Sequence, residues 1–523
     1  MHGTTHSPIP LETWHIAKPA GHGRKGVVVA QEIEAARVGA DMISTGGNAV
    51  DAAVATALAL TVTEPWMSGL GGGGFMVAYI AAERAVRVID FAMVAPAALE
   101  PSDYPLTGAA GAEMFGWPQV EGDANIHGPK SIAVPGSVAG YGLAGATYGR
   151  KPWADLVAPA IALAERGHRV TWWTTLQVAA EADLLARYPV SSAVWLPGGL
   201  PPSMPQDATA SFLSMGALAR SLRMLADEGP QGFYEGALAR SMVHDVRAAG
   251  GCLSDADLAG YSARIVEPLQ LPRGEAVYHV PRGLTAGPTF AAALRQLPHL
   301  ESASPDPGTY GAYAAALVDA YRQRLERLGH SGDDGSRSCT THISTADADG
   351  NLVMLTTTLL SPFGSRMVLP DSGILMNNGI NWFDPRPGGP NSLAPGQRPL
   401  TNMCPMVATR NGAPWFGYGA SGGRKIMPSV FQLASFTNDF GMEVETALAH
   451  PRLDASGIDT LVHDGRLDAA TAAAIAAVAP STPWGPTSFP SMYANPSGAA
   501  ITAGGGCVGA VHPYSPVSGV AVA

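Results

Sequence analysis

The sequence is poor in charged residues and has no long apolar run. Only 14% of its 523 residues are Asp, Glu, Lys or Arg, and the formal net charge is −11. Because no run of Lys or Arg is available to neutralise phosphates, a nucleic-acid or anionic-membrane partner is not expected. The longest apolar runs, 52–62 and 472–480, are too short to span a bilayer. Residues 1–25 contain no apolar run that would suit a secretory signal peptide, so a cytoplasmic protein is expected.

Cysteine is also scarce. The chain has four cysteines, Cys252, Cys339, Cys404 and Cys507, which lie far apart and form no C-x-x-C pair. The 14 histidines are scattered along the sequence. This pattern favours neither structural disulfides nor a zinc site. We expect no metal and no cofactor.

Hydrophobic residues make up 46% of the chain, which is enough for a large core. Its length allows one large α/β domain or two to four smaller ones. Strand patterns are predicted near both ends of the chain, at 27–30, 75–80, 86–91, 341–346, 352–359, 373–376 and 415–418. Helical patterns are predicted at 33–43, 48–63, 309–328, 425–436 and 468–478, and through a mostly helical middle at about 151–330. This order predicts one sheet system built by both ends of the chain.

Threonines crowd onto one predicted hairpin. The turn Asp-Ala-Asp-Gly at 347–350 is strong hairpin chemistry, because Asp-Gly tolerates positive φ. Closing the hairpin there pairs residues whose numbers sum to about 697–699, so Thr340 faces Thr357, Thr358 or Leu359. Two interpretations are open at this point. The threonines form an exposed sheet face, or Thr340 is a nucleophile with a hydroxyl partner.

A threonine hydroxyl needs a base before it can act as a nucleophile. The residue's own α-amine supplies one if the chain is cut before it, and its pKa of about 7.7–8.0 suits general-base catalysis near neutral pH. The polar segment 331–338 precedes Thr340 and would suit such a cut between Cys339 and Thr340. Cys339 is the rival nucleophile, with a cut after Ser338, but the hairpin register directs a threonine at the hydroxyl cluster.

A glycine pair stands between a predicted strand and a predicted helix. Gly422 and Gly423 lie where successive backbone N–H groups can converge on an oxyanion. A plain tight turn is the alternative interpretation.

Nine segments, in order along residues 46–426, resemble the γ-glutamyltransferase (γ-glutamyltranspeptidase, glutathione hydrolase) family. They are GGNAVDAAVA at 46–55, EPWMSGLGGGGFMV at 64–77, VPGSVAGY at 134–141, GPQGFYEGALA at 229–239, GGCLSDADLAGY at 250–261, TTH at 340–342, GILMNN at 373–378, RPLTNMCP at 398–405 and SGGRKI at 421–426. The resemblance implies the αββα sandwich of N-terminal-nucleophile hydrolases, made as a proenzyme that cuts itself. The fragments 1–339 and 340–523 would then stay together as a heterodimer, or as a dimer of heterodimers.

The same resemblance implies roles for individual residues. Thr340 is the nucleophile and new N-terminus, Thr358 is the hydroxyl bonded to it, and Gly422 and Gly423 form the oxyanion hole. Asn378 belongs to the substrate-binding Asn-Asn motif.

Departures from the family pattern fall on substrate recognition. Ala92 in DFAMVAP stands where γ-glutamyl enzymes carry an arginine for the α-carboxylate. Leu360 replaces an asparagine, and Trp382 aligns with the acidic residue that holds the α-ammonium. Thr401 and Asn402 replace paired serines. In addition, the segment 383–398 is too short for the family's lid loop, and PRGLTAG at 281–287 replaces a PPPSSGG-like motif.

An unpaired buried ammonium or carboxylate costs several kcal/mol, so glutathione recognition in the standard pose should be weak. Arg424 or Lys425, beside the glycine pair, could still bind one carboxylate. The sequence therefore predicts a self-processing threonine amidohydrolase or acyltransferase. It would cleave a small γ-glutamyl or γ-glutamyl-like amide through an acyl-Thr340 intermediate, which water or an amine resolves. The alternatives are an acylase for another amide, such as a glutaryl-type side chain, and an unprocessed, inactive scaffold.

Overall fold

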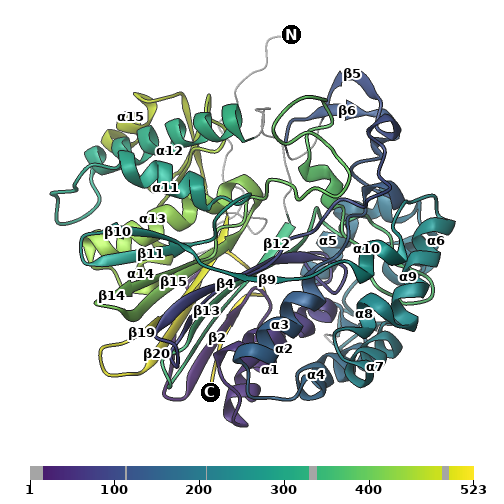
Figure 1. Ribbon diagram of the computed structural model, residues 1–523. Helices are drawn as coiled ribbons and strands as arrows, with labels where there is room; N and C mark the ends of the chain where they lie inside the picture. Colours follow the sequence, from purple (N-terminus) through teal and green to yellow (C-terminus); the bar gives the residue numbers. More distant parts are fainter. Residues whose placement is uncertain (1–15, 112–114, 208, 329–338, 486–493) are drawn as a thin grey trace.

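Two seven-stranded antiparallel sheets stack face to face at the centre of the molecule (Figure 1). The computed structural model describes residues 16–111, 115–207, 209–328, 339–485 and 494–523. Helices cover the outer face of each sheet, which gives the four layers of an αββα sandwich and confirms the predicted fold class.

The first sheet takes strands from both ends of the chain. Its order is β21-β2-β12-β13-β3-β4-β9. The strands are β2 (Gly26–Ala30), β3 (Gly73–Ile80), β4 (Ala85–Phe91), β9 (Arg264–Val266), β12 (Cys339–Asp347), β13 (Leu352–Leu360) and β21 (Gly519–Val522). The prediction of one sheet system built by both ends is confirmed.

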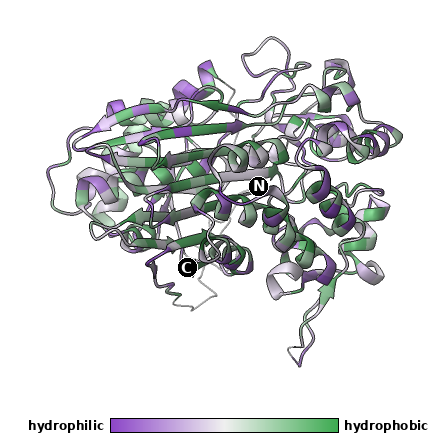
Figure 2. Cartoon of the chain, turned by 60° about the horizontal axis from the view of Figure 1, so that its bottom comes forward, coloured by the Kyte–Doolittle hydropathy of each residue, from purple (hydrophilic) through white to green (hydrophobic). Residues whose placement is uncertain are grey.

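The second sheet has the order β1-β20-β19-β15-β14-β11-β10. Its strands are β1 (Gly21–Gly23), β10 (Leu269–Arg273), β11 (Ala276–Val280), β14 (Met406–Arg410), β15 (Ala413–Ser421), β19 (Asn495–Ile501) and β20 (Cys507–Val511). Apolar side chains of both sheets, among them Val77, Met354, Val407 and Ala499, fill the layer between them. The green strands in the middle of Figure 2 show this apolar interior.

Helices of the first half of the chain cover the first sheet. They are α1 (Ile33–Ser44), α2 (Ala49–Thr63), α3 (Ser137–Tyr148) and α4 (Trp153–Arg166), followed by α5 (Trp172–Leu185), α6 (Pro189–Trp195), α7 (Leu218–Glu228), α8 (Gly232–Glu235), α9 (Ala237–Ala248) and α10 (Asp255–Ala259). All 15 residues of α2 are buried, as its uniformly small and apolar sequence requires. Asn48 caps α2 with its side chain, as the sequence predicts.

The second sheet is covered by later helices. They are α11 (Gly287–Gln296), α12 (Pro307–Arg327), α13 (Ile426–Phe440) and α14 (Val444–Ala449), with α15 (Ala469–Ala476) packed against α12. Short strands complete the chain: β5 (Leu106–Ala110) with β6 (Pro118–Val120), β7 (His168–Arg169) with β8 (Phe212–Leu213), and β16 (Leu453–Asp454), β17 (Leu461–Asp464) and β18 (Ser481–Trp484).

The predicted strand at 373–376 is wrong. The segment makes only isolated bridges, between Leu375 and Val368 and between Met376 and Gly71. Gly373 has a φ of +69°, and its Cα packs against the backbone that leads into α7. A turn at this point prevents the segment from extending along a sheet edge.

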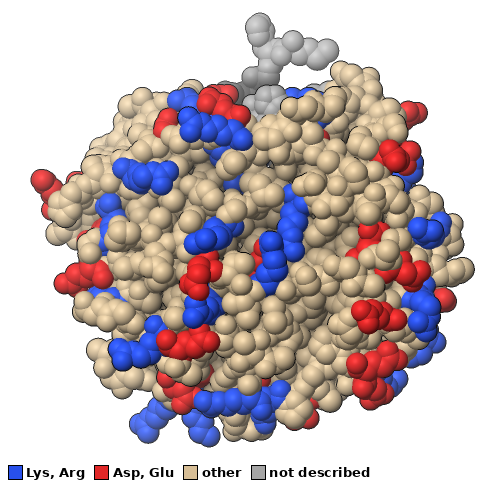
Figure 3. Space-filling view, in the orientation of Figure 1, with Lys and Arg blue, Asp and Glu red and all other residues tan. Residues whose placement is uncertain are grey.

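The charged side chains on the surface are mixed in sign, and the described helices are not of the membrane-spanning type, as the composition predicts. Figure 3 shows acidic and basic side chains interspersed over one face without a large patch of one sign. Among the helices in the described ranges, none is long and apolar enough to cross a membrane. Cys252, Cys404 and Cys507 are free thiols.

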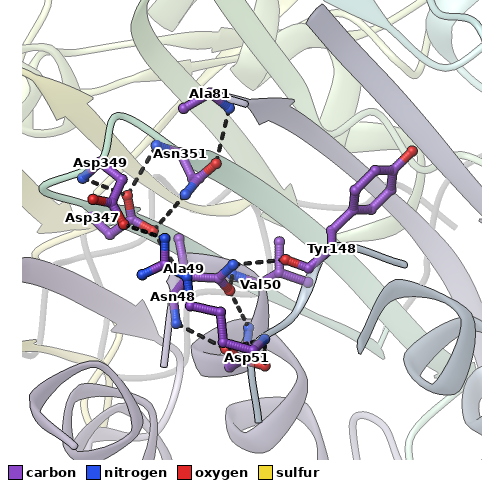
Figure 4. Close-up of polar contacts among 10 residues, drawn as sticks. Asn48, Ala49, Val50, Asp51, Ala81, Tyr148, Asp347, Asp349 and Asn351 are labelled. Atoms are coloured by element: carbon purple, nitrogen blue, oxygen red, sulfur yellow. Dashed lines mark hydrogen bonds and ion pairs between the residues drawn. The ribbon is translucent and has the colours of Figure 1, made fainter. Parts of the chain in front are cut away.

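One carboxylate ties the β12–β13 turn to the start of α2 (Figure 4). Asp347 Oδ1 accepts from the backbone N–H groups of Asp349 and Asn351, each at 3.0 Å. Its Oδ2 accepts at 2.8 Å from the N–H of Ala49 and from Nδ2 of Asn351. Because Asp347 is buried, these donors would be left without a partner if the carboxylate were removed.

We therefore expect Asp347→Ala to lower the free energy of unfolding by about 3 kcal/mol, since bonds to a charged group are the strong ones and buried donors are costly to leave unmade. Urea unfolding followed by circular dichroism measures this loss. Asp349→Ala is the matched control: its exposed carboxylate pairs only with the exposed Arg150, at 2.8 Å, a contact worth less than about 1 kcal/mol. Equal losses in the two variants would contradict the anchoring role of Asp347.

Candidate active site

The threonine hairpin forms in the predicted register. Residues from Thr341↔Thr357 to Ala346↔Leu352 pair directly, and their numbers sum to 698. At the open end of the hairpin Cys339 pairs with Leu360, so the single residue Thr340 lies opposite two residues of β13. This irregularity is a β-bulge, a feature that often re-aims a side chain at functional sites.

The threonines of this hairpin are buried on both faces of the sheet. Thr340 is 4% exposed, and Thr341, Thr356, Thr357 and Thr358 are fully buried. The interpretation of an exposed threonine-rich face is therefore wrong. Each hydroxyl needs its own partner instead, because burying one without a hydrogen bond costs free energy.

On the face between the two sheets, the two predicted catalytic hydroxyls meet. Thr340 Oγ1 donates to Thr358 Oγ1 at 3.3 Å. Thr358 Oγ1 also accepts from the backbone N–H of Leu360 at 2.8 Å, which holds the hydroxyl in place. The structure thus brings Thr340 and Thr358 together, as both the hairpin register and the resemblance predict.

Leu360 follows with a φ of +87°, in a region that bulky side chains rarely adopt. The family's asparagine at this position would adopt that conformation more readily. A strained residue two positions after Thr358 is a further mark of a functional site.

On the opposite face, the hydroxyls bind groups from the helical layer. Thr341 Oγ1 donates to the carboxyl of Glu64 at 2.8 Å, and Thr357 Oγ1 lies 2.8 Å from the hydroxyl of Tyr141. Glu64 is the residue after α2 and is buried. Burial raises the pKa of Glu64 to about 8, while the Thr341 hydrogen bond acts in the other direction.

Close contacts between the sheets show how β12 and β13 lie against β15. A Cβ added to Gly417 would lie 2.7 Å from Met354 Cε, and one added to Gly419 would lie 2.1 Å from His342 Cε1. Met354 pairs with Ser344 and His342 pairs with Thr356. Across the two sheets, moving from Ser344 back to His342 on β12 therefore corresponds to moving from Gly417 forward to Gly419 on β15. Thr340 lies two residues before His342 on β12, and Ser421, immediately before the glycine pair, lies two residues after Gly419 on β15.

Gly422 and Gly423 have φ angles of +133° and +56°, which glycine adopts readily. A Cβ on Gly422 would also lie 2.8 Å from the Cα of Ala494. The pair joins β15 to a short 3-10 turn at Gly423–Lys425 and then to α13. The predicted position between strand and helix is confirmed.

His342 is the third residue of the TTH motif at 340–342, and its side chain is fully buried. Its Nδ1 lies 2.8 Å from Thr356 Oγ1 and its Nε2 lies 3.1 Å from Ser344 Oγ. Burial lowers the pKa of His342 to about 3, so the ring stays neutral. It supports the hairpin and packs against Gly419 rather than serving as a base.

Three of the predicted substrate-binding residues line one small cavity. Trp382, Asn402 and Arg424 share it with Phe115, Trp117, Arg324, Leu325, Asn391 and Leu400. Ala92, Leu360 and Trp382, the residues that replace the family's charged or polar anchors, belong to the same apolar cluster as Phe115 and Trp117. These three residues therefore belong to the apolar interior between the two sheets.

Asn378 and Thr401, two further predicted substrate-binding residues, form hydrogen bonds with other residues of the protein. Asn378 donates from Nδ2 to the carbonyl of Ile126 and to Ser361 Oγ, and its Oδ1 accepts from the N–H of Ser361. Thr401 donates from Oγ1 to the carbonyl of Leu284 at 3.2 Å. These bonds tie both side chains to neighbouring segments of the chain.

Sequence reasoning missed two residues of this site, Glu64 and Arg324. Glu64 begins the segment EPWMSGLGGGGFMV, where a lone carboxylate between an apolar helix and Pro65 is a signal that the sequence does offer. Arg324 lies on α12 and has no motif around it. Within the described ranges, no group of three or more His, Cys, Asp or Glu side chains is placed to hold a metal ion.

The αββα sandwich, with a threonine pair at the start of a central strand, defines the class of N-terminal-nucleophile hydrolases. The sequence model of the Gamma-glutamyltranspeptidase family matches residues 35–338 and 325–492, and the chain belongs to that family of hydrolases and transferases. It is 34% identical over 501 residues to the Acylase ACY 1 proenzyme of Pseudomonas sp. (strain SE83), covering 86% of each chain. It is 30% identical to the Glutathione hydrolase proenzyme of Escherichia coli (strain K12), covering 85% of this chain and 84% of that one. The crystal structure of cephalosporin acylase from Bacillus halodurans has the same fold, with a TM-score of 0.84 at 23% identity over 100% of this chain and 99% of the other.

The raised pKa of Glu64 predicts how its contribution to stability changes with pH. In the unfolded chain the carboxyl has a pKa of about 4.3, whereas in the folded protein its pKa is about 8. As pH rises between these values, the unfolded chain releases the proton and the folded protein keeps it, so stability is lost. We expect the melting temperature of the wild type, relative to that of Glu64→Gln, to fall across this window and to level off outside it. Thermal unfolding of both proteins from pH 4 to 9 checks this, and a constant difference would show that Glu64 does not titrate as its burial requires.

Proposed function

We propose that the protein is a self-processing threonine amidohydrolase that cleaves a γ-glutamyl-like amide lacking the α-ammonium. The observation that carries the proposal is the Thr340–Thr358 hydroxyl pair, at 3.3 Å, which lies at the bulge of the β12–β13 hairpin. Family membership and the likeness to an acylase proenzyme support it.

In the uncut chain the nitrogen of Thr340 is part of a peptide bond and cannot act as a base. Thr340 Oγ1 attacks the carbonyl carbon of Cys339, the carbon–nitrogen bond breaks, and the nitrogen takes the hydroxyl proton. The resulting ester is hydrolysed by water, which leaves a carboxylate on Cys339 and a free hydroxyl and amine on Thr340. The fragments 1–339 and 340–523 remain a heterodimer because each contributes strands to both sheets.

In turnover, the freed amine accepts the proton of the Thr340 hydroxyl as the oxygen attacks the substrate amide. The oxyanion that forms is bound by backbone N–H groups of Gly422 and Gly423. The leaving amine takes the proton, and acyl-Thr340 remains until water or an acceptor amine resolves it. Thr358 orients the attacking oxygen through the hydrogen bond already present.

The acyl end of the substrate is where this chain differs from γ-glutamyl enzymes. Ala92, Leu360 and Trp382 offer no group that could pair with an α-ammonium, and all three are buried. Leaving such a charge unpaired costs several kcal/mol. Hydrolysis of a γ-glutamyl amide such as glutathione is the second candidate function, favoured by the family match and by the similarity to the E. coli glutathione hydrolase.

The proposal predicts self-cleavage between Cys339 and Thr340, giving fragments of 339 and 184 residues (523 − 339). Thr340→Ala should abolish both cleavage and turnover because it removes the attacking oxygen. Thr340→Ser should retain part of both, and Cys339→Ala should leave both largely intact. Denaturing gels, N-terminal sequencing of the small fragment and an anilide assay measure these outcomes.

Two results would overturn this assignment. A single full-length band from an active protein would show that no new N-terminus is needed, and loss of activity in Cys339→Ala alone would make the cysteine the nucleophile. A single band without activity would favour the inactive scaffold.

A second prediction concerns the α-ammonium. Glutaryl-anilide and γ-glutamyl-anilide differ only in that group, so kcat/KM should be at least tens-fold higher for the glutaryl compound. Steady-state kinetics on the processed enzyme measures the ratio. A clear preference for the γ-glutamyl compound would mean that other residues rebuild the ammonium site, and glutathione hydrolysis would become the favoured function.

A further inference from the structure

The segment that follows α2 contacts both strands of the threonine hairpin. The carboxyl of Glu64 accepts from Thr341 Oγ1 at 2.8 Å. Three residues later, the carbonyl of Met67 accepts from the backbone N–H of Leu359 at 3.0 Å. Thr341 and Leu359 are the residues immediately after the two hydroxyl-bearing threonines of the candidate site. One short segment therefore holds the chain directly beside both hydroxyls.

This segment is itself fixed to the end of a buried helix. The backbone N–H of Glu64 donates to the carbonyl of Leu60 at 2.9 Å and so closes the last turn of α2. The carbonyl of Glu64 in turn accepts from the N–H of Met67 at 3.1 Å. Since Glu64 is 2% exposed, its carboxyl reaches Thr341 from a fixed point in the helical layer.

The start of β12 is the part of the strand that its neighbours support least. The ladder between β12 and β2 covers Ser344–Asp347, and the ladder between β12 and β13 is interrupted between Cys339 and Thr341. Thr340 lies within this interruption. The hydrogen bond from Thr341 to Glu64 therefore adds a contact from the helical layer where the sheet holds the strand weakly.

At neutral pH the carboxyl of Glu64 makes this contact without a charge. Burial raises the pKa of Glu64 to about 8, the charge of Glu32 acts in the same direction, and the hydrogen bond of Thr341 acts in the other. The group therefore keeps its proton and serves as a neutral hydrogen-bond acceptor. The amide of glutamine is neutral and has a carbonyl oxygen, so it is a close replacement for this carboxyl.

We infer that Glu64 is a positioning residue for the nucleophile: by holding Thr341, it sets where the hydroxyl and the freed amine of Thr340 lie. The inference rests on the proposed function, because it assumes that Thr340 attacks both the carbonyl of Cys339 and the substrate amide. A displacement of a reacting atom by about 1 Å can cost about 100-fold in rate. Because Glu64 bonds on the face of the sheet opposite to the Thr340 hydroxyl, its loss should lower kcat and leave KM unchanged.

The first test removes this hydrogen bond from either side. Glu64→Leu takes away the acceptor and Thr341→Val takes away the donor, and both keep a side chain of similar size. Self-cleavage is followed on denaturing gels after cell-free synthesis. Steady-state kinetics on the processed enzyme uses whichever of glutaryl-anilide and γ-glutamyl-anilide the wild type cleaves faster. In both variants we expect self-cleavage and kcat to fall at least about tenfold, with KM changed less than about twofold.

Two further variants separate the hydrogen bond from the side chain that makes it. Glu64→Gln should keep both rates within about threefold of the wild type, because the acceptor remains. The double variant Glu64→Leu/Thr341→Val should be no slower than the slower single variant, since both changes remove the same contact. Full additivity of the two losses would show that Glu64 and Thr341 act separately, and it would overturn the inference.

Thr345→Val is the matched control. Thr345 Oγ1 donates to the carbonyl of Ala49 at 2.7 Å, so this variant also removes a buried hydrogen bond between β12 and α2. Thr345 lies five residues after Thr340, and both rates should stay within about twofold of the wild type. Thermal unfolding of each variant compares the losses of stability. An equal fall of kcat in Thr345→Val would make the effect one of general stability and would overturn the inference.

The remaining outcomes distinguish the inference from the proposed function. Unchanged self-cleavage and kcat in Thr341→Val would overturn the inference and leave the amidohydrolase standing. If neither Glu64→Leu nor Thr341→Val folds, as judged by circular dichroism, the contact serves stability and the inference also fails. A processed wild type that cleaves neither anilide would refute the proposed function, and the rates of self-cleavage would still decide the role of Glu64. A wild-type chain that stays uncut would refute both.

Discussion

The close approach of β12 and β15 across the sandwich is the contact on which the rest of the site depends. At Gly417 and Gly419 there is no room for a side chain, because Met354 and the ring of His342 fill the space. The two contacts fix the sliding position of one sheet on the other. Thr340 lies two residues from His342 and Gly422 lies three residues from Gly419, so this packing contact also constrains where these two candidate site residues lie.

The parts of this arrangement that are local in sequence could be predicted from it. The Asp-Gly turn at 347–350 determines the hairpin register, and the register brings Thr340 to Thr358. The cap at Asn48 and the strand-to-helix position of Gly422–Gly423 are local in the same way. The strand expected at 373–376 failed because a short apolar run has the same pattern whether it pairs along a sheet or bends at a glycine.

What could not be predicted depends on contacts between distant segments. The burial of the threonines on both faces follows from layers that only the fold assembles, with Glu64 and Tyr141 on one face and the second sheet on the other. Arg324 has no local pattern at all, since only the fold brings it to the same cavity as Arg424, 100 residues later.

The position of β12 in the sheet order has a consequence for entropy. A new chain end is ordinarily mobile, and a catalytic amine on it would have to be immobilised at each turnover. Here Thr340, which the proposed cut would make the chain end, lies at the start of a strand that pairs with β2 on one side and β13 on the other, and the next residue, Thr341, is hydrogen-bonded to Glu64. Folding has already removed the freedom of this terminus before any bond is cut. The proposed cut would therefore release an amine that is ordered from the start, at no further entropic cost to the reaction.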